Sequence, residues 1–315
     1  MTSIQIDSEG RLRHLITLEG LSEDRIIALL DRAAALRTSF REGAQGPQLL
    51  AGRTVVNLFF ETSTRTRSSF ELAARRLGAH VLNFDIAHSS TGKGESLEDT
   101  LSTLEAMQSD AFIVRHRENG MPARLAGHAR RAAILNAGDG NHAHPTQGLL
   151  DALTIRDHHG GFDGLKVTLC GDILHSRVAR SDVHVLRALG ASEIRLCGPR
   201  ALLPDPAAFS GCALFEDFDE ALAGSHVLIM LRLQRERMQQ ALIGDEAEYF
   251  HRYGLTRDRL SRAADDALVM HPGPMNRGIE IADEVADGAQ SAVLRQVANG
   301  VPVRMAALAT LLEGR

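Results

Sequence analysis

The chain has 315 residues, of which 44% are hydrophobic and 24% are charged, and its formal net charge is −5. This length suits two globular domains, and the acidic balance excludes an overall positive field that would hold nucleic acid or an anionic membrane. Any anion-binding site must therefore be local. The start has no signal-peptide pattern and no apolar run reaches membrane-spanning length, so we expect a cytoplasmic protein. The cysteines form no metal-type pair and are expected to be buried, reduced thiols: Cys170, Cys197 and Cys212.

The first half of the chain alternates between amphipathic segments and short apolar runs, which is typical of an α/β fold with largely parallel sheets. Ser22 is a candidate N-cap for an early helix, because Glu23 and Asp24 follow it and apolar residues then recur at helical spacing. Further helices are expected at residues 68–78 and 96–107. The expected strands cover residues 53–61, 80–85, 110–116 and 132–138.

The second half repeats this alternation after a polar, glycine-rich stretch at 155–166 that suits a linker. Strands are expected at residues 166–172, 192–199, 226–231 and 266–274, the last running into a loop. Helices are expected at residues 176–190, 218–225 and 301–314, the last with Pro302 near its first turn. The predicted domains are 1–150, joined by the C-terminal helix 295–315, and 151–294. Each is expected to contain a largely parallel sheet flanked by helices.

The sequence "STRTR" at 63–67 lies between an expected strand and an expected helix. A helix N-terminus exposes backbone N–H groups and favours anions, and Arg65 adds a planar fork that matches phosphate oxygens. A simpler interpretation is a capped helix whose arginines are solvated. Five consecutive donors exceed what capping needs, and open α/β sheets bind ligands at the carboxyl ends of their strands. We therefore favour a phosphate-type anion site.

Nucleotide and metal sites have weaker support. "GDGNHA" at 138–143 matches the G-x-G-x-x-A pattern, but Pro145 interrupts the expected helix start, and no acidic residue at the end of a strand follows about 20 residues on, as a ribose contact would require. A dinucleotide-dependent dehydrogenase therefore remains only an alternative. His142 and His144 could form a metal pair, but no third ligand lies nearby at metal-site spacing, so we expect no metal.

Other polar side chains also follow expected strands. Because groups of this kind recur at strand ends in both halves, we expect an active site in a cleft between the two domains, lined to receive more than one negative charge. The polar residues that follow expected strands in this way are Arg115, His116, His144, Gln147, Arg177, Arg232, Gln234 and the "HPGP" segment 271–274.

Five motifs together resemble one known family. They are "STRTR" at 63–67, "GKGES" at 92–96, "HPTQ" at 144–147, "LRLQRER" at 231–237 and "HPGP" at 271–274. The sequence resembles the aspartate/ornithine carbamoyltransferases over roughly residues 15–312, and within that family the catalytic chains that use aspartate. The first and third motifs indicate carbamoyl phosphate, and the second and fourth indicate aspartate.

The resemblance implies transfer of the carbamoyl group of carbamoyl phosphate to the amine of L-aspartate. The products would be N-carbamoyl-L-aspartate, a precursor of pyrimidines, and phosphate, with no cofactor or metal. The implied phosphate ligands are Ser63, Thr64, Arg65 and Thr66. Arg115, His144, Gln147 and the backbone carbonyls of Pro272 and Gly273 would hold the carbamoyl group. Lys93, Arg177, Arg232 and Gln234 would bind aspartate. Arg65, Thr66, Arg115 and His144 would stabilise the transition state.

The resemblance also implies an assembly. Ser89 and Lys93 would enter the active site of a neighbouring chain, so the working unit would be a homotrimer with shared sites, and regulatory or dihydroorotase-like partner chains are possible. Glu61 would pair with Arg177 and Arg237 in a closed form, and we assign Arg67 a structural role. Two alternatives stay open: a carbamoyltransferase for another amino acid such as ornithine, and a catalytically silent assembly subunit.

Overall fold

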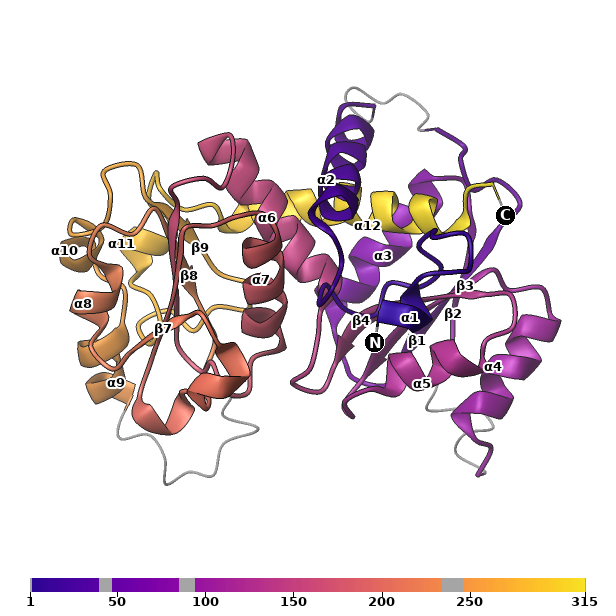
Figure 1. Cartoon of the computed structure of the whole chain (residues 1–315), viewed down its shortest axis with the longest axis horizontal. Helices are drawn as coiled ribbons and strands as arrows, with labels where there is room; N and C mark the ends of the chain where they lie inside the picture. Colours follow the sequence, from indigo (N-terminus) through magenta and orange to yellow (C-terminus); the bar gives the residue numbers. More distant parts are fainter. Residues whose placement is uncertain (1, 40–46, 85–93, 234–245, 315) are drawn as a thin grey trace. The chain divides into compact units, whose positions relative to one another are not determined.

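The computed structural model describes residues 2–39, 47–84, 94–233 and 246–314 of the chain (Figure 1). The chain divides into two compact units, each of which is considered separately. Unit 1 comprises residues 1–150 and 298–315, and unit 2 comprises residues 151–297. Two helices cross the division: α6 (Pro145–His159) and α12 (Val293–Leu312). None of the helices in the described ranges has the length and apolarity that crossing a membrane requires.

Unit 1 contains a parallel sheet of four strands in the order β2-β1-β3-β4. Its strands β1, β3 and β4 are buried along almost their whole length, which explains why they appear in the sequence as continuous apolar runs. The strands are β1 (Thr54–Phe59), β2 (His80–Asn83), β3 (Ala111–His116) and β4 (Ala133–Asp139). The helices are α1 (Thr2–Gln5), α2 (Glu23–Thr38), α3 (Thr64–Arg76), α4 (Leu97–Ala106) and α5 (Met121–His128).

The expected strands of unit 1 are present, but two helix starts differ from the prediction. Helix α3 begins at Thr64, four residues earlier than expected, so most of the "STRTR" motif forms its first turn. Helix α6 begins at Pro145, which the sequence analysis took as an interruption. Proline fits the first turn of a helix, because the backbone N–H groups there have no intrahelical partner and the proline ring already has helical φ. The prediction also missed α1 and α5, and it contained no helix at the position of α6.

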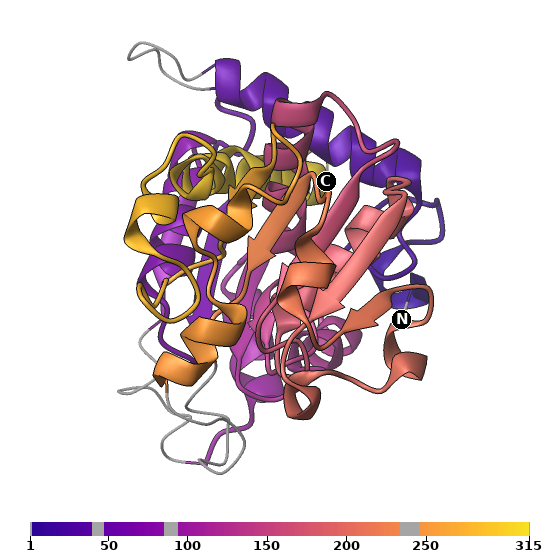
Figure 2. The ribbon, with the colours of Figure 1, turned by 90° about the vertical axis from the view of Figure 1, so that its left-hand side faces the viewer.

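Unit 2 contains a parallel sheet of five strands in the order β7-β6-β5-β8-β9 (Figure 2). The strands are β5 (Lys166–Cys170), β6 (Glu193–Cys197), β7 (Ala213–Phe215), β8 (Val227–Met230) and β9 (Leu268–Met270). The α-helices are α7 (Arg177–Ala188), α8 (Phe218–Leu222), α9 (Glu246–Tyr253), α10 (Arg257–Leu260) and α11 (Asp283–Ala286). Two short 3₁₀ helices, η3 (Arg200–Leu202) and η4 (Pro206–Phe209), lie between β6 and β7.

Three predictions for this region were wrong in part. The first residues of the expected linker continue α6 as far as His159. Helix α12 begins at Val293, so Pro302 lies inside the helix and not in its first turn. Cys170 and Cys197 are buried thiols as expected, whereas Cys212 is only partly buried. The prediction also missed β7 and the short helices α9, α10 and α11, which carry too few residues for a clear periodic pattern.

In each sheet there is one pair of neighbouring strands after which the chain continues to opposite sides of the pair. In unit 1 this position lies between β1 and β3, because the intervening strand β2 pairs on the other side of β1. In unit 2 it lies between β5 and β8, because β6 and β7 extend the sheet from the other side of β5. Open α/β sheets bind ligands at the carboxyl ends of the strands beside such positions. The fold therefore marks one candidate ligand edge in each unit.

Two carboxyl groups lie together in the core of unit 2, Asp151 on α6 and Asp182 on α7, and each is only 1% exposed. Burial and the charge of nearby Asp151 raise the pKa of Asp182 well above its ordinary value. In the part of the chain that the structure describes, no N–H group donates to either oxygen of Asp182. Asp182 is therefore best described as a neutral carboxylic acid beside Asp151, whose Oδ1 accepts from Gln296 Nε2 at 2.6 Å.

We expect Asp182→Asn to stabilise the protein at neutral and alkaline pH. A carboxyl whose pKa is raised by folding binds its proton more tightly in the folded state, so stability falls as pH rises above the unfolded pKa of about 3.9. An uncharged amide of similar size removes this loss, because it has no charged form to bury. The melting temperature should rise by about 2–4 °C at pH 8, the shift that 1 kcal/mol gives in a domain of this size.

Thermal unfolding at pH 5, 6.5 and 8 tests this expectation. The difference between Asp182→Asn and the parent chain should shrink as the pH falls. Asp163→Asn, at an exposed position of the same unit, is the matched control and should leave the pH profile unchanged. A variant that is equally less stable at all three values would show that Asp182 is not a protonated acid.

Candidate active site

The anion motif of unit 1 forms the junction between β1 and α3. Ser63 has extended backbone angles (φ −161°, ψ 98°) and occupies the N-cap position, but its side chain makes no capping hydrogen bond. Thr64, Arg65 and Thr66 form the first helical turn, where unpaired backbone N–H groups favour an anion. Because the Ser63 hydroxyl does not cap the helix, the geometry favours a ligand site over the simpler interpretation of a capped helix.

Arg115 lies at the end of β3, next to β1 in the sheet. Its side chain is mostly buried, with its Nη2 donating to Glu61 Oε1 at 2.7 Å and its Nη1 to the Ala137 carbonyl at 3.2 Å. These contacts hold the guanidinium at the carboxyl ends of both neighbouring strands, β1 and β4. Glu61 therefore contacts Arg115 in this structure. Its implied pairing with Arg177 and Arg237 in a closed form stays a prediction, and Arg237 lies outside the described residues.

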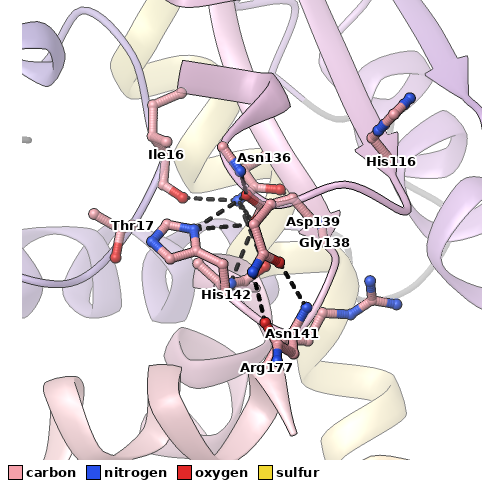
Figure 3. A network of polar contacts seen from close by, with 12 residues as sticks. Ile16, Thr17, His116, Asn136, Gly138, Asp139, Asn141, His142 and Arg177 are labelled. Carbon is pink, nitrogen blue, oxygen red and sulfur yellow. Dashed lines mark hydrogen bonds and ion pairs between the residues drawn. The ribbon is translucent and has the colours of Figure 1, made fainter. Parts of the chain in front are cut away.

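The loop after β4 leads through His144 into the first turn of α6, which carries Gln147, and a buried carboxylate holds this loop in place. Asp139 is fully buried and accepts hydrogen bonds from the Asn136 side chain at 2.8 Å and from His142 Nδ1 at 3.1 Å (Figure 3). It also accepts from two backbone N–H groups, those of Gly120 at 2.7 Å and Ala143 at 3.1 Å. Burial alone raises the pKa of Asp139, but these donors outweigh it and hold the pKa below its ordinary value.

Asp139 therefore connects the loop before α5 to the loop before α6. His144 and Gln147 follow at the start of α6, and both are mostly buried, at 5% and 8% exposure. The glycine pattern at 138–143 has a structural explanation, because Gly138 (φ 116°) and Gly140 (φ 43°) adopt backbone angles that this turn requires. His142 points to Asp139, and the described residues contain no group of three metal-ligating side chains.

Unit 2 places cationic side chains at the corresponding edge of its own sheet. Arg177 begins α7 after β5 and is 8% exposed, and the Ser176 hydroxyl caps this helix by accepting from Ala179 N at 3.1 Å. Arg232 follows β8, the strand that pairs with β5. Leu231 N donates to the Cys170 carbonyl at 2.8 Å, which extends that pairing up to the residue before Arg232.

The "HPGP" segment follows β9, the next strand in the sheet. The backbone N–H of Gly273 donates to His271 Nδ1 at 2.8 Å, and that of His271 donates to Gln296 Oε1 at 2.9 Å. These bonds fix the peptide units of Pro272 and Gly273, whose carbonyls are the predicted ligands. The structure thus gathers those predicted residues that it describes at the carboxyl ends of three adjacent strands in each unit: β1, β3 and β4 in unit 1, and β5, β8 and β9 in unit 2.

Three predicted residues, Ser89, Lys93 and Gln234, lie outside the described residues. Conversely, the sequence analysis missed Asp139, Glu280 and Gln296, which hold the ligand-bearing loops. Asp139 is the second residue of the G-x-G-x-x-A pattern at 138–143, and this pattern by itself points only to the glycines. A carboxylate at the carboxyl end of a buried strand is a usable signal for such a residue, whereas Glu280 and Gln296 have no comparable local signal.

Both units of the chain match domains of one known protein family. Residues 13–157 match the family described as aspartate/ornithine carbamoyltransferase, carbamoyl-P binding domain, and residues 163–311 match its Asp/Orn binding domain. The chain belongs to the aspartate/ornithine carbamoyltransferase family. The resemblance inferred from the five motifs is thereby confirmed, as is the α/β fold with two parallel-sheet domains.

Individual carbamoyltransferases resemble the chain over nearly its full length. The aspartate carbamoyltransferase catalytic subunit of Xanthomonas campestris pv. campestris is 60% identical, over 99% of this chain and 100% of the relative. The corresponding subunit of Stenotrophomonas maltophilia is 58% identical with the same coverage. A crystal structure of aspartate transcarbamoylase from Trypanosoma cruzi with N-(phosphonacetyl)-L-aspartic acid has a TM-score of 0.88 at 33% identity, covering 99% of both chains. Ornithine carbamoyltransferase from Pyrococcus furiosus has a TM-score of 0.86 at 27% identity, covering 96% and 98%.

Proposed function

We propose that this carbamoyltransferase transfers the carbamoyl group of carbamoyl phosphate to the amine of L-aspartate, giving N-carbamoyl-L-aspartate and phosphate. The observation that best supports the proposal is that hydroxyl and arginine side chains follow adjacent parallel strands in both sheets, with the "STRTR" motif in unit 1 and Arg177 and Arg232 in unit 2. The relatives that are about 60% identical support aspartate as the acceptor.

The first substrate would be held by unit 1. The N-terminus of α3, with Ser63, Thr64 and Thr66, would bind the phosphate, and Arg65 would match the charge that grows on this group as it leaves. Donors aimed at the carbonyl oxygen of the carbamoyl group would stabilise the negative charge of the tetrahedral transition state. Arg115, Thr66 and His144 are the proposed donors, and Gln147 and the carbonyls of Pro272 and Gly273 would orient the carbamoyl amine.

Aspartate would be held by its two carboxylates. Arg177 and Arg232 offer the planar forks that pair with carboxylates, and Gln234 and Lys93 would assist. None of the proposed ligands is an obvious general base for the aspartate amine, so we propose that a phosphate oxygen takes the amine proton. The amine of aspartate must reach the carbamoyl carbon for the new bond to form. The proposal therefore requires that side chains of both units bind the two substrates in one active site.

The assembly is part of the proposal. We propose a homotrimer in which Ser89 and Lys93 complete the site of an adjacent chain. Mixing the inactive variants Lys93→Ala and Arg65→Ala under conditions that exchange subunits tests this sharing. Hybrid trimers should regain activity, because some sites receive both intact residues, whereas sites confined to one chain would stay inactive.

Product analysis tests the reaction itself. The purified chain is incubated with carbamoyl phosphate and either aspartate or ornithine, and phosphate and the ureido product are measured. We expect phosphate release with N-carbamoyl-L-aspartate and no citrulline. Citrulline as the main product would instead support the ornithine alternative, and an inactive, folded chain would support a silent assembly subunit.

A further inference from the structure

Glu280 is a charged side chain inside the core of unit 2, with 0% exposure. Its Oε1 accepts from the backbone N–H of Leu233 at 3.0 Å and from Asn276 Nδ2 at 2.6 Å. Its Oε2 accepts from the backbone N–H of Asn276 at 2.6 Å. A buried carboxylate is tolerated when several donors satisfy both oxygens, and these three bonds meet that requirement.

The histidine of the "HPGP" segment faces the same carboxylate. His271 Nδ1 accepts from the backbone N–H of Gly273, so the neutral ring carries its proton on Nε2. This nitrogen lies 3.7 Å from Glu280 Oε2. The charge of Glu280 therefore favours the ring tautomer that holds the Gly273 peptide in place.

The partners of Glu280 belong to two different loops. Leu233 directly follows Arg232 after β8, and Asn276 and His271 belong to the segment after β9 that contains Pro272 and Gly273. We infer that Glu280 is a positioning residue that sets the register between Arg232 and the carbonyl groups of Pro272 and Gly273. The inference rests on the proposed function, in which the first of these groups binds aspartate and the others bind the carbamoyl amine.

A carboxylate of this length is required by the geometry. In the variant Glu280→Gln, the amide oxygen could still accept two hydrogen bonds, but the amide NH₂ would then face the N–H of Asn276 and the ring of His271, both of which are donors. Aspartate keeps the charge but is shorter by one C–C bond, about 1.5 Å, and could not reach both loops. Misplacement of a substrate-positioning group by about 1 Å can reduce turnover by about 10²-fold.

The test compares Glu280→Gln and Glu280→Asp with the parent chain and with Glu284→Gln, an exposed carboxylate nearby on α11. Both Glu280 variants should lower kcat/KM for aspartate by about 10²-fold. They should also weaken binding of N-(phosphonacetyl)-L-aspartate. Binding of inorganic phosphate, which depends on the α3 motif of unit 1, should be unchanged, and Glu284→Gln should match the parent chain.

Three results would overturn the inference. The first is aspartate kinetics close to the parent in both Glu280 variants, and the second is full activity in Glu280→Asp alone, which would assign the effect to charge. The third is equal weakening of phosphate and phosphonacetyl-aspartate binding. If the Glu280 variants do not fold, Asn276→Ala removes a single side-chain bond to the carboxylate and should lower kcat/KM for aspartate by about 10-fold; no loss would then contradict the inference. An inactive parent chain would instead refute the proposed function.

Discussion

Arg65→Ala is expected to abolish measurable turnover while leaving the fold intact. Arg65 is exposed in the first turn of α3, so its removal takes little packing from the core. In the proposed reaction, however, the leaving phosphate gains charge at the N-terminus of this helix, and a guanidinium is the side chain that matches its oxygens. Removal of a single transition-state donor typically costs about 10²–10³-fold in turnover, and in the proposed reaction Arg65 would also bind the phosphate of the ground state.

Initial rates at saturating aspartate, with carbamoyl phosphate varied, measure this effect, and thermal unfolding checks the fold. Arg75→Ala is the matched control: it lies on the same helix, is exposed and pairs with Glu71 at 2.9 Å, so its loss should leave activity unchanged. Arg65→Lys keeps the charge without the planar fork and should be intermediate. Near-normal activity of Arg65→Ala would contradict the assignment of the phosphate site.

The strands and the polar residues that follow them were accessible from the sequence for a physical reason. A strand buried on both faces appears as a continuous apolar run, and parallel strands present their carboxyl ends at one edge. Arg115 and Arg232 could therefore be placed at ligand edges without knowledge of strand order. The order β2-β1-β3-β4, which puts Arg115 beside the α3 motif, depends on pairing between distant segments and needed the structure.

Helix boundaries were harder to predict because the preferences of the residues at these boundaries favour loops or helix interruptions, whereas the structure has helix there. Hydroxyl residues are typical of caps and loops, so Thr64 and Thr66 were assigned to a loop although they form the first turn of α3. Pro145 and Pro302 illustrate the same difficulty. The first starts α6, and the second is accommodated within α12, where the rest of the helix continues.

The side chains that hold the loops could not be predicted from the sequence, for a different reason. Glu280 contacts Leu233, which is 47 residues away in the sequence, and Asp139 contacts Gly120, which is 19 residues away. A polar residue in a sequence does not indicate which distant backbone N–H group it will meet. Such contacts appear only when the strands are placed side by side, and they decide how rigidly the predicted ligands are held.

Arg232→Ala is expected to affect aspartate selectively. Arg232 follows β8 at the ligand edge of unit 2, and the adjacent residue Leu233 is tied to the buried carboxylate of Glu280. Loss of one partner of a desolvated charge pair costs about 2–5 kcal/mol, and each 1.4 kcal/mol is tenfold. The value of kcat/KM for aspartate should therefore fall by about 10²-fold or more, with a large rise in KM.

Phosphate binding separates this effect from general damage. Inorganic phosphate and carbamoyl phosphate would bind through the α3 motif of unit 1, so their affinities should be close to those of the parent chain when measured without aspartate. Arg262→Ala removes another arginine of unit 2, one that is exposed and pairs with Asp219 at 3.2 Å, and should leave all constants unchanged. If Arg232→Ala reduced the affinity for carbamoyl phosphate and left the KM for aspartate intact, the assignment of the acceptor site to the loop after β8 would be wrong, because the arginine of this loop would then serve the donor substrate.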